Sequence, residues 1–379
     1  MTDKRIHGRK TKRRRFLATA GALGAAGLAG CSGSLGGNGD GNGDTADSPV
    51  GQIGSGREGR DAPGGTSMSE MPDLSGELTV YSGRGEFLVG DLISYIDTLY
   101  EDLELTVRYA SSTDLVNQIV NEGDGSPADV FYSVNAGALG ALADEGRTGP
   151  LEESILEMVR EEFRTDTWIG TSGRARTIPY NTDAFTAEDV PNEIMDYPEA
   201  FDGDLGWAPS YGSCQAFVTA MRLIEGEEAT RGWLEAVIDD GITDYPDEFA
   251  ACQAVADGEI DAAFTNHYYI QRVIDGNPGA SIGTAFTSGD AGAMFNVAGA
   301  AVVDTTDDES LANGFVRHLL SSEAQDYFAT STFEYPLIPD VEPVGDLPSI
   351  DELDVPDIDL TQLSELEPTV DLMRDVGAL

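Results

Sequence analysis

The chain has 379 residues, of which 40% are hydrophobic and 8% aromatic, so it carries enough apolar material for packed cores and is too long for one ordinary core. Its formal charge of −46 is divided unevenly along the chain. The part after Cys31 contains 14 arginines, no lysine and 67 aspartates and glutamates, so its formal charge is 14 − 67 = −53. A surface this acidic excludes nucleic-acid binding, which needs a basic face, and it is typical of proteins that work in molar salt. We therefore expect a halophilic, archaeal source.

The first 31 residues have the pattern of an export signal with a lipid attachment site. The basic run Lys12–Arg15, followed by Phe16 and Leu17, looks like a twin-arginine motif. The apolar stretch 16–29 that follows is too short and too rich in Ala and Gly to favour a membrane span. It ends in Leu-Ala-Gly-Cys31, which resembles a lipobox, so Cys31 is the predicted lipidation site. A plain signal-anchor helix is the alternative.

Residues 32–72 are mostly Gly, Asn, Asp and Ser, with almost no bulky apolar side chains. Such a segment cannot bury enough surface to offset the entropy of ordering it. We predict a disordered tether, which would hold a folded domain at the outer face of the cell membrane.

From Glu77 the pattern becomes an alternation of strands and helices. Strands are predicted over Leu78–Tyr81, Leu103–Tyr109 and Ala128–Ser133, and helices over Phe87–Leu99, from Ser111 or Ser112 to Gly123, and up to Gly146. This order predicts a parallel sheet with crossover helices, in which ligands bind beyond the carboxyl ends of the strands. The loops at those ends are Ser82–Glu86, Ala110–Ser112 and Ser133–Asn135.

A second series of elements follows, and its first part predicts a second lobe. Strands are predicted there over Thr177–Tyr180, Leu205–Trp207 and Ile260–Phe264, and helices over Ser213–Ile224, Ala229–Ile238 and Glu248–Ala256. The strand Val297–Val303 and the helices Asp308–Leu320 and Ser322–Ala329 come next and are assigned to the first lobe. The acidic tail 340–379 is punctuated by proline and contains one predicted helix, Leu360–Leu366. The fold class is therefore α/β, with two lobes that are each a mainly parallel sheet flanked by helices, a hinge, and a cleft between the lobes.

Two adjacent tyrosines, Tyr268 and Tyr269, come directly after a predicted buried strand, in the position of a ligand site. A phenolate is an oxygen donor that suits a hard ion such as Fe³⁺, once the cation has lowered the phenol pKa. One packed ring and one interfacial ring is the alternative interpretation, and spacing alone favours it.

Six motifs, in order and with fitting spacing, resemble the ferric-iron-binding proteins of ABC importers, a branch of the type II periplasmic binding proteins. They are Val80-Tyr81-Ser82-Gly83-Arg84, Pro127–Phe131, Ser172-Gly173-Arg174-Ala175-Arg176, Trp207–Ser213, Gly258–Asp261 and Asn266-His267-Tyr268-Tyr269. The resemblance covers roughly residues 77–345. It implies a binding lipoprotein, not an enzyme, that captures ferric iron in the cleft and delivers it to a permease and its ATPase.

The resemblance also implies which residues bind the metal. The family's two iron-binding tyrosines occupy the places of Tyr268 and Tyr269, and Tyr211 stands where some members have a phosphate-binding serine. Glu86 or Glu248 is expected as a weaker fourth ligand, with a solvated carboxylate as the alternative for each. Gly85 and about Val134 stand where some members have a histidine and a glutamate ligand. Because Tyr211 and Glu248 stand where phosphate-dependent members have a serine and an asparagine, this chain resembles the branch that uses more tyrosines.

Anion-binding or supporting roles are expected for the remaining polar residues of these motifs. They are Arg84, Arg174, Arg176, Ser213 and Asn266. The arginines could hold a synergistic anion such as carbonate, or balance tyrosinate charge, and pairing with the abundant carboxylates is the alternative.

The expected organisation follows from these assignments. The signal is 1–31, the tether 32–72, the first lobe 77–176 plus about 297–345, and the second lobe about 177–296 plus 346–379. A monomer is expected. Cys214 and Cys252 could form a disulfide or remain buried thiols. Another cargo, such as thiamine, a polyamine or an oxyanion such as phosphonate, remains an alternative within the same class.

Overall fold

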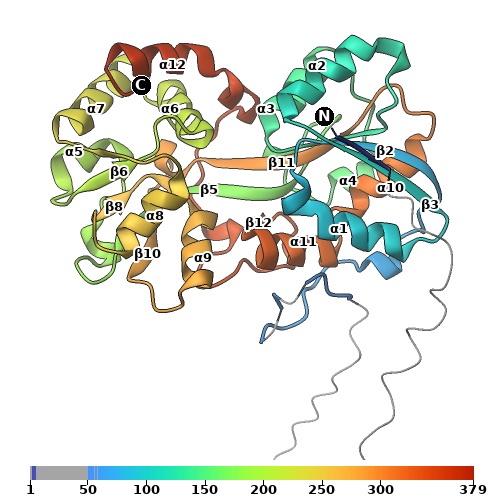
Figure 1. Ribbon diagram of the computed structural model, residues 1–379, viewed down its shortest axis with the longest axis horizontal. Helices are drawn as coiled ribbons and strands as arrows, with labels where there is room; N and C mark the ends of the chain where they lie inside the picture. Colours follow the sequence, from blue (N-terminus) through green and yellow to red (C-terminus); the bar gives the residue numbers. More distant parts are fainter. Residues whose placement is uncertain (1, 6–49, 55, 58) are drawn as a thin grey trace, which may run out of the picture.

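The computed structural model describes residues 2–5, 50–54, 56, 57 and 59–379, which form two lobes joined by long strands (Figure 1). The strands are β1 (Thr2–Arg5), β2 (Gly76–Ser82), β3 (Leu103–Tyr109), β4 (Val130–Ser133), β5 (Ile169–Asn181), β6 (Leu205–Trp207), β7 (Thr243–Asp244), β8 (Ala262–Ala263), β9 (Thr265–Asn266), β10 (Ile282–Ala285), β11 (Phe295–Val302) and β12 (Tyr335–Pro336). The α-helices are α1 (Glu86–Leu99), α2 (Ser112–Glu122), α3 (Ala136–Asp144), α4 (Glu153–Leu156), α5 (Tyr197–Ala200), α6 (Gly212–Ile224), α7 (Glu227–Asp239), α8 (Glu248–Ala256), α9 (His267–Gly276), α10 (Glu309–His318), α11 (Ser322–Tyr327) and α12 (Leu366–Asp375). Two 3-10 helices matter below, η1 (Met68–Glu70) and η9 (Leu360–Ser364), and η7 (Phe328–Thr332) is a π-helix.

The first lobe is built on a mixed sheet whose order is β1-β3-β2-β4-β11-β5. Its centre is parallel, because β2 pairs with β3 on one side and with β4 on the other in the same direction. The strands β1 and β11 run antiparallel to their neighbours β3 and β4. The helices α1, α2 and α3 supply the crossovers, so the carboxyl ends of β2 and β4 open toward the middle of the molecule.

The second lobe continues the same sheet across β5, in the order β5-β8-β6-β7. There β6, β7 and β8 are parallel to one another, and β5 pairs antiparallel with β8, β9 and β10. The strands β5 and β11 run through the centre of Figure 1 between the lobes. This confirms the predicted two-lobe α/β class.

Local sequence signals account for most element boundaries. Ser111 caps α2 through its side chain, which accepts a hydrogen bond from the Asp114 N–H, and Gly123 ends that helix with φ +56°. In contrast, β5 is much longer than the predicted strand 177–180, since it begins at Ile169. Its first half carries Ser and Arg side chains that mask the apolar pattern of a buried strand.

The expected tether is wrong for the part of it that the structure describes. Ile53 and Met68 are buried at 5% and 0% exposure, and η1 is closed by a capping box between Ser67 and Glu70. The Glu323 carboxylate accepts hydrogen bonds from the Ser67 hydroxyl (2.6 Å) and the Met68 N–H (2.9 Å). A few apolar side chains and a buried carboxylate are therefore sufficient to fix a segment whose composition predicts disorder. Residues 32–49 lie outside the described residues.

The acidic tail, expected wholly in the second lobe, contacts both lobes. η9 packs against α3 of the first lobe and against α6, and α12 packs against α6 of the second lobe. The single predicted helix 360–366 is in fact η9 followed by α12, because the backbone at Glu365 leaves helical geometry between them. Within the described residues, no helix combines the length and the apolar character needed to cross a bilayer.

Candidate metal-binding site

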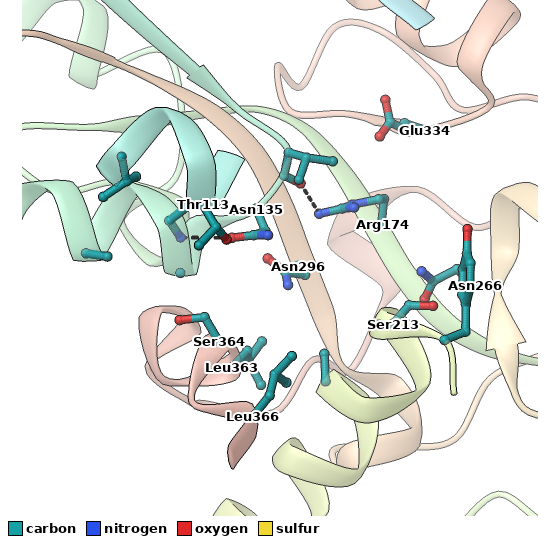
Figure 2. A pocket seen from close by; sticks show the side chains of 18 of the residues that line it. Thr113, Asn135, Arg174, Ser213, Asn266, Asn296, Glu334, Leu363, Ser364 and Leu366 are labelled. Atoms are coloured by element: carbon teal, nitrogen blue, oxygen red, sulfur yellow. Dashed lines mark hydrogen bonds between the residues drawn. The ribbon is translucent and has the colours of Figure 1, made fainter. Parts of the chain in front are cut away.

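A cavity of about 820 Å³ lies between the lobes. Its walls come from α1, α2 and α3 on one side and from α6 and α9 on the other, with β5, β11 and the C-terminal tail between them. Figure 2 shows Thr113 and Asn135 on the first side and Ser213 and Asn266 on the second, with Asn296 between. The cavity therefore lies where the carboxyl ends of the parallel strands predict a ligand site.

Three tyrosines converge on the second-lobe wall of this cavity. Tyr211 precedes α6 as its N-cap residue, and Tyr268 and Tyr269 occupy the first turn of α9. The Tyr211 and Tyr269 hydroxyl oxygens are 2.7 Å apart, and the Tyr268 and Tyr269 ring centroids are 4.3 Å apart. The three residues expected as ligands are thus brought together, although the two adjacent tyrosines begin a helix, where an extended strand end was expected.

The environment keeps two of these phenols protonated in the free protein. Burial is the main cause that raises the pKa of Tyr269 well above its ordinary value, and repulsion from a Tyr268 phenolate and the hydrogen bond with Tyr211 raise it further. Burial also raises the pKa of Tyr268, against the opposing charge of Arg174. The phenols can therefore act as anionic ligands only if a cation displaces their protons.

Two arginines present positive charge to the tyrosines. The Arg272 guanidinium lies 5.0 Å from the Tyr268 ring centroid and 5.4 Å from that of Tyr269, within the range of cation–π attraction. The Arg174 guanidinium donates a hydrogen bond to the Val134 carbonyl and has no carboxylate within 4.0 Å among the described residues. Both side chains line the cavity, so they can offset the charge of phenolates or hold an anion there.

Glu248 lies beneath the tyrosines, away from the cavity lining. It is fully buried, and its Oε1 accepts hydrogen bonds from Arg176 and from the Ser213 hydroxyl, both at 2.5 Å. Its Oε2 accepts the backbone N–H of Asn266 at 2.9 Å. Every oxygen of the expected fourth ligand is thus engaged, and Glu248 ties α6, α8 and the start of α9 to β5 beneath the tyrosines.

The structure likewise separates Arg176 from any anion-binding role. Its guanidinium is fully buried in the pair with Glu248, donates to the Phe264 carbonyl at 2.5 Å and lies 4.7 Å from the Phe217 ring centroid. Asn266 and Ser213 do line the cavity, and the Asn266 side-chain amide donates to the Tyr268 hydroxyl at 3.4 Å. Asn266 therefore orients a tyrosine, as the sequence suggested.

Arg84 is also a buried structural cation, unlike Arg174. It donates hydrogen bonds to the Ser172 hydroxyl at 2.9 Å and to the Glu334 carboxylate at 2.6 Å. Burial opposes ionisation of Glu334, but the charges of Arg84 and Arg174 outweigh it and hold the pKa of Glu334 below its ordinary value. Since Glu334 lines the cavity, this network connects the wall of the site to the base of the first lobe.

Glu86, the other expected fourth ligand, is not brought to the tyrosines. It begins α1 and borders a separate cavity of about 190 Å³ with Asp91, Ser94 and Tyr109. Its neighbour Phe87 points its side chain outward, at 87% exposure, and lines the interlobe cavity instead. The first turn of α1 therefore presents an aromatic ring to the cavity.

The histidines and cysteines of the described residues lie apart from the cavity lining. His267 is buried, accepts a hydrogen bond from the Ala175 N–H at 3.1 Å, and burial lowers its pKa to about 4. His318 packs against Tyr100, whose hydroxyl lies 2.6 Å from its Nε2. Cys214 and Cys252 are both buried free thiols, which decides between the two alternatives left open by the sequence. Within the described chain, no group of three or more His, Cys, Asp or Glu side chains could hold a metal.

Several cavity residues escaped the sequence analysis. They are Asn296, Arg272, Glu334 and Leu363, whereas Asn135 belongs to one of the loops in which a ligand was expected. Arg272 could have been found, because it lies four residues after Tyr268 and three after Tyr269, which is one face of a helix. Asn296 is a polar residue in an otherwise apolar strand, a weaker signal. Glu334 has no signal in so acidic a chain. The predicted lipidation site, Cys31, lies outside the described residues.

Comparison with known proteins gives a consistent result. The family model described as bacterial extracellular solute-binding protein matches residues 98–352. The major ferric iron-binding protein of Neisseria meningitidis is 30% identical over 309 residues, covering 79% of this chain and 93% of that protein. Iron uptake protein A2 of Synechocystis is 31% identical over 301 residues, covering 74% and 86%. Among solved structures, iron-bound HitA from Pseudomonas aeruginosa superposes with a TM-score of 0.69 and 29% identity, over 81% of this chain and all of that one.

Proposed function

The chain belongs to the bacterial extracellular solute-binding proteins, and we propose that it captures ferric iron between its lobes through the phenolates of Tyr211, Tyr268 and Tyr269. The observation that carries this proposal is the convergence of three phenol groups on one wall of the cavity, with two of their hydroxyls 2.7 Å apart. Ferric iron is a hard cation that favours anionic oxygen donors, and three phenolates balance its three charges.

The proposed ligand set contains no carboxylate. Both oxygens of Glu248 accept internal hydrogen bonds, and Glu86 borders a different cavity. Positions on the iron that the tyrosines leave open would be filled by an anion such as carbonate. Arg174 is the best placed arginine for that anion, because its guanidinium lines the cavity free of carboxylate partners in the described part of the chain.

The neighbouring arginine argues against an organic cation as cargo. A polyamine would be recognised by aromatic faces and carboxylates, yet the Arg272 guanidinium already lies over both tyrosine rings. A metal-free oxyanion could accept hydrogen bonds from the protonated phenols, but relatives and solved structures that match this chain are named as iron-binding or iron-bound proteins, which favours the metal. We therefore place ferric iron ahead of thiamine, polyamines and phosphonate.

The cellular role follows from the leader and the family. We propose export by the twin-arginine route, lipid attachment at Cys31, and action as a monomer at the outer face of the membrane. Loaded protein would deliver iron to an ABC permease driven by its ATPase subunit. A binding protein needs no acid–base pair. Closure of the two lobes around the cargo is the conformational change that such a permease would recognise.

The test is a visible-absorption titration of the purified protein with ferric citrate in molar salt. A tyrosinate-to-iron charge-transfer band should saturate at one equivalent and disappear in the Tyr268→Phe, Tyr269→Phe double variant. Tyr180→Phe is the matched control, since the Tyr180 ring packs against Gly283 on β10 and its hydroxyl has no hydrogen bond within the described residues. Saturable iron binding that survives the double variant would overturn the ligand assignment, and folded protein without binding would overturn the cargo.

A further inference from the structure

The C-terminal segment Leu360–Asp375 connects the two lobes across one side of the cavity. Its first part, η9, lies against α3 of the first lobe and its second part, α12, lies against α6 of the second. Figure 1 shows α12 along the upper edge of the molecule above α6, with the segment that precedes it extending toward α3. The segment is a third connection between the lobes, in addition to the strands β5 and β11.

The contact with the first lobe is close and is not anchored by hydrogen bonds or ion pairs. A Cβ atom added to Gly140 would lie 2.6 Å from Thr361 Cγ2, and one added to Gly137 would lie 2.3 Å from Ser364 Cβ. Two glycines one turn apart on α3 thus form the groove that receives η9. Within the described residues, no hydrogen bond or ion pair joins η9 to α3, so this contact can open without leaving a buried polar group unpaired.

The contact with the second lobe is anchored by polar groups. The Thr219 and Thr369 hydroxyls form a buried hydrogen bond of 2.7 Å between α6 and α12, and Arg222 donates to Thr369 at 3.1 Å. Leu372 and Met373 are buried at 3% and 0% exposure on the same helix. Separating α12 from α6 would break these bonds and expose these side chains, which makes α12 the fixed end of the segment.

The junction between the fixed and the unanchored part borders the proposed binding cavity. Leu363, Ser364 and Leu366 line it, below Asn296 in Figure 2. We propose that η9 is a clasp, carried on the second lobe by α12, which docks in the Gly137–Gly140 groove when the lobes are close and leaves it when they part to exchange cargo. The identity of the cargo rests on the function proposed above, but the clasp itself does not.

The clasp can be locked by a disulfide. In Gly140→Cys, Thr361→Cys the two Cβ atoms would start 2.7 Å apart, and a small outward shift brings them to the roughly 3.5–4.5 Å that a disulfide needs. The matched control is Thr219→Cys, Thr369→Cys, which would join α6 to α12 within one lobe at a pair of hydroxyls 2.7 Å apart. Cys214 and Cys252 are buried thiols and should not compete for oxidation.

The readout is the rate at which iron-loaded protein releases ferric ion to excess citrate. Loss of the phenolate absorption band reports this release. The oxidised Gly140–Thr361 variant should release iron about ten-fold more slowly than its reduced form, because closed states are then favoured, and the oxidised control should match its reduced form. Equal rates in the oxidised and reduced Gly140–Thr361 variant would overturn the clasp, as would equal slowing in the control.

Two further measurements keep the inference testable if the disulfide fails to form or iron fails to bind. Gly140→Val should displace η9 and speed release several-fold, whereas Gly232→Val, on α7 with nothing within 4 Å of its added Cβ, should not. Small-angle scattering of cargo-free protein should show a smaller radius of gyration for the oxidised Gly140–Thr361 variant than for its reduced form. A difference in scattering without any iron band would refute the cargo and keep the clasp, and identical scattering would refute the clasp.

Discussion

Glu248→Gln tests whether the carboxylate beneath the tyrosines supports the site or binds the metal. The substitution preserves shape but removes the negative charge from a pair in which both side chains have 0% exposure. It would leave Arg176 buried without a counter-ion, for which the expected cost is about 3–5 kcal/mol of the free energy of unfolding. For a protein of this size the loss corresponds to a fall of roughly 4–6 °C in Tm. Because the pair is buried, molar salt should screen the effect little.

Thermal and urea unfolding of wild type and variant in the same salt measure this loss. Glu227→Gln is the matched control, since Glu227 also pairs with an arginine, Arg222 at 3.4 Å, but is 63% exposed. That control should change stability by less than about 1 kcal/mol. The phenolate band should persist in Glu248→Gln at low temperature. A variant that keeps wild-type stability but loses the band would refute the supporting role and make Glu248 a ligand.

Three other outcomes are expected. Burial raises the pKa of Tyr268 and Tyr269, so iron must displace phenol protons when it binds. A pH-stat should therefore record up to one proton released per tyrosine, and the affinity for iron should rise with pH. Iron binding without proton uptake or release would contradict phenolate ligands. Arg272→Met should weaken iron binding by about ten-fold, and Arg272→Lys should weaken it less, because the lysine keeps the positive charge near the tyrosine rings. Competition with citrate measures both affinities. Equal losses of affinity in the two variants would count against a charge effect. Burial raises the pKa of Cys214 to about 12 and also raises the pKa of Cys252. Neither thiol should therefore react with a thiol reagent at neutral pH until the protein unfolds. Rapid labelling of the folded protein would contradict their burial.

Sequence reasoning performed well wherever a single residue has one dominant physical role. Ser111 and Gly123 could be recognised as the ends of α2, because few other residues satisfy helix termini so well. The tyrosines could be recognised from their motif, but their position at the start of α9 could not. Short apolar runs do not distinguish a strand end from a helix start, and β8 and β9 contain only two residues each.

The failures share a different physical cause, which is that contacts far apart in the sequence decide the role of a charged side chain. Arg84, Arg174 and Arg176 look alike in the sequence, yet two are neutralised by buried carboxylates and one faces the cavity. The partner of Arg84 is Glu334, which is 250 residues away along the chain. No local pattern could identify that residue among 68 acidic ones.

The buried phenols also suggest how so acidic a protein could select its cargo. A cluster of cavity carboxylates would be ionised at neutral pH and would attract any abundant cation, whereas Tyr268 and Tyr269 stay protonated because burial raises their pKa. Only a cation acidic enough to displace the phenol protons gains three anionic ligands, and a trivalent ion meets that condition far better than sodium, potassium or magnesium. Competition by these ions at molar concentration should therefore leave the proposed iron site occupied, and loss of the phenolate band in molar magnesium would contradict this account of its selectivity.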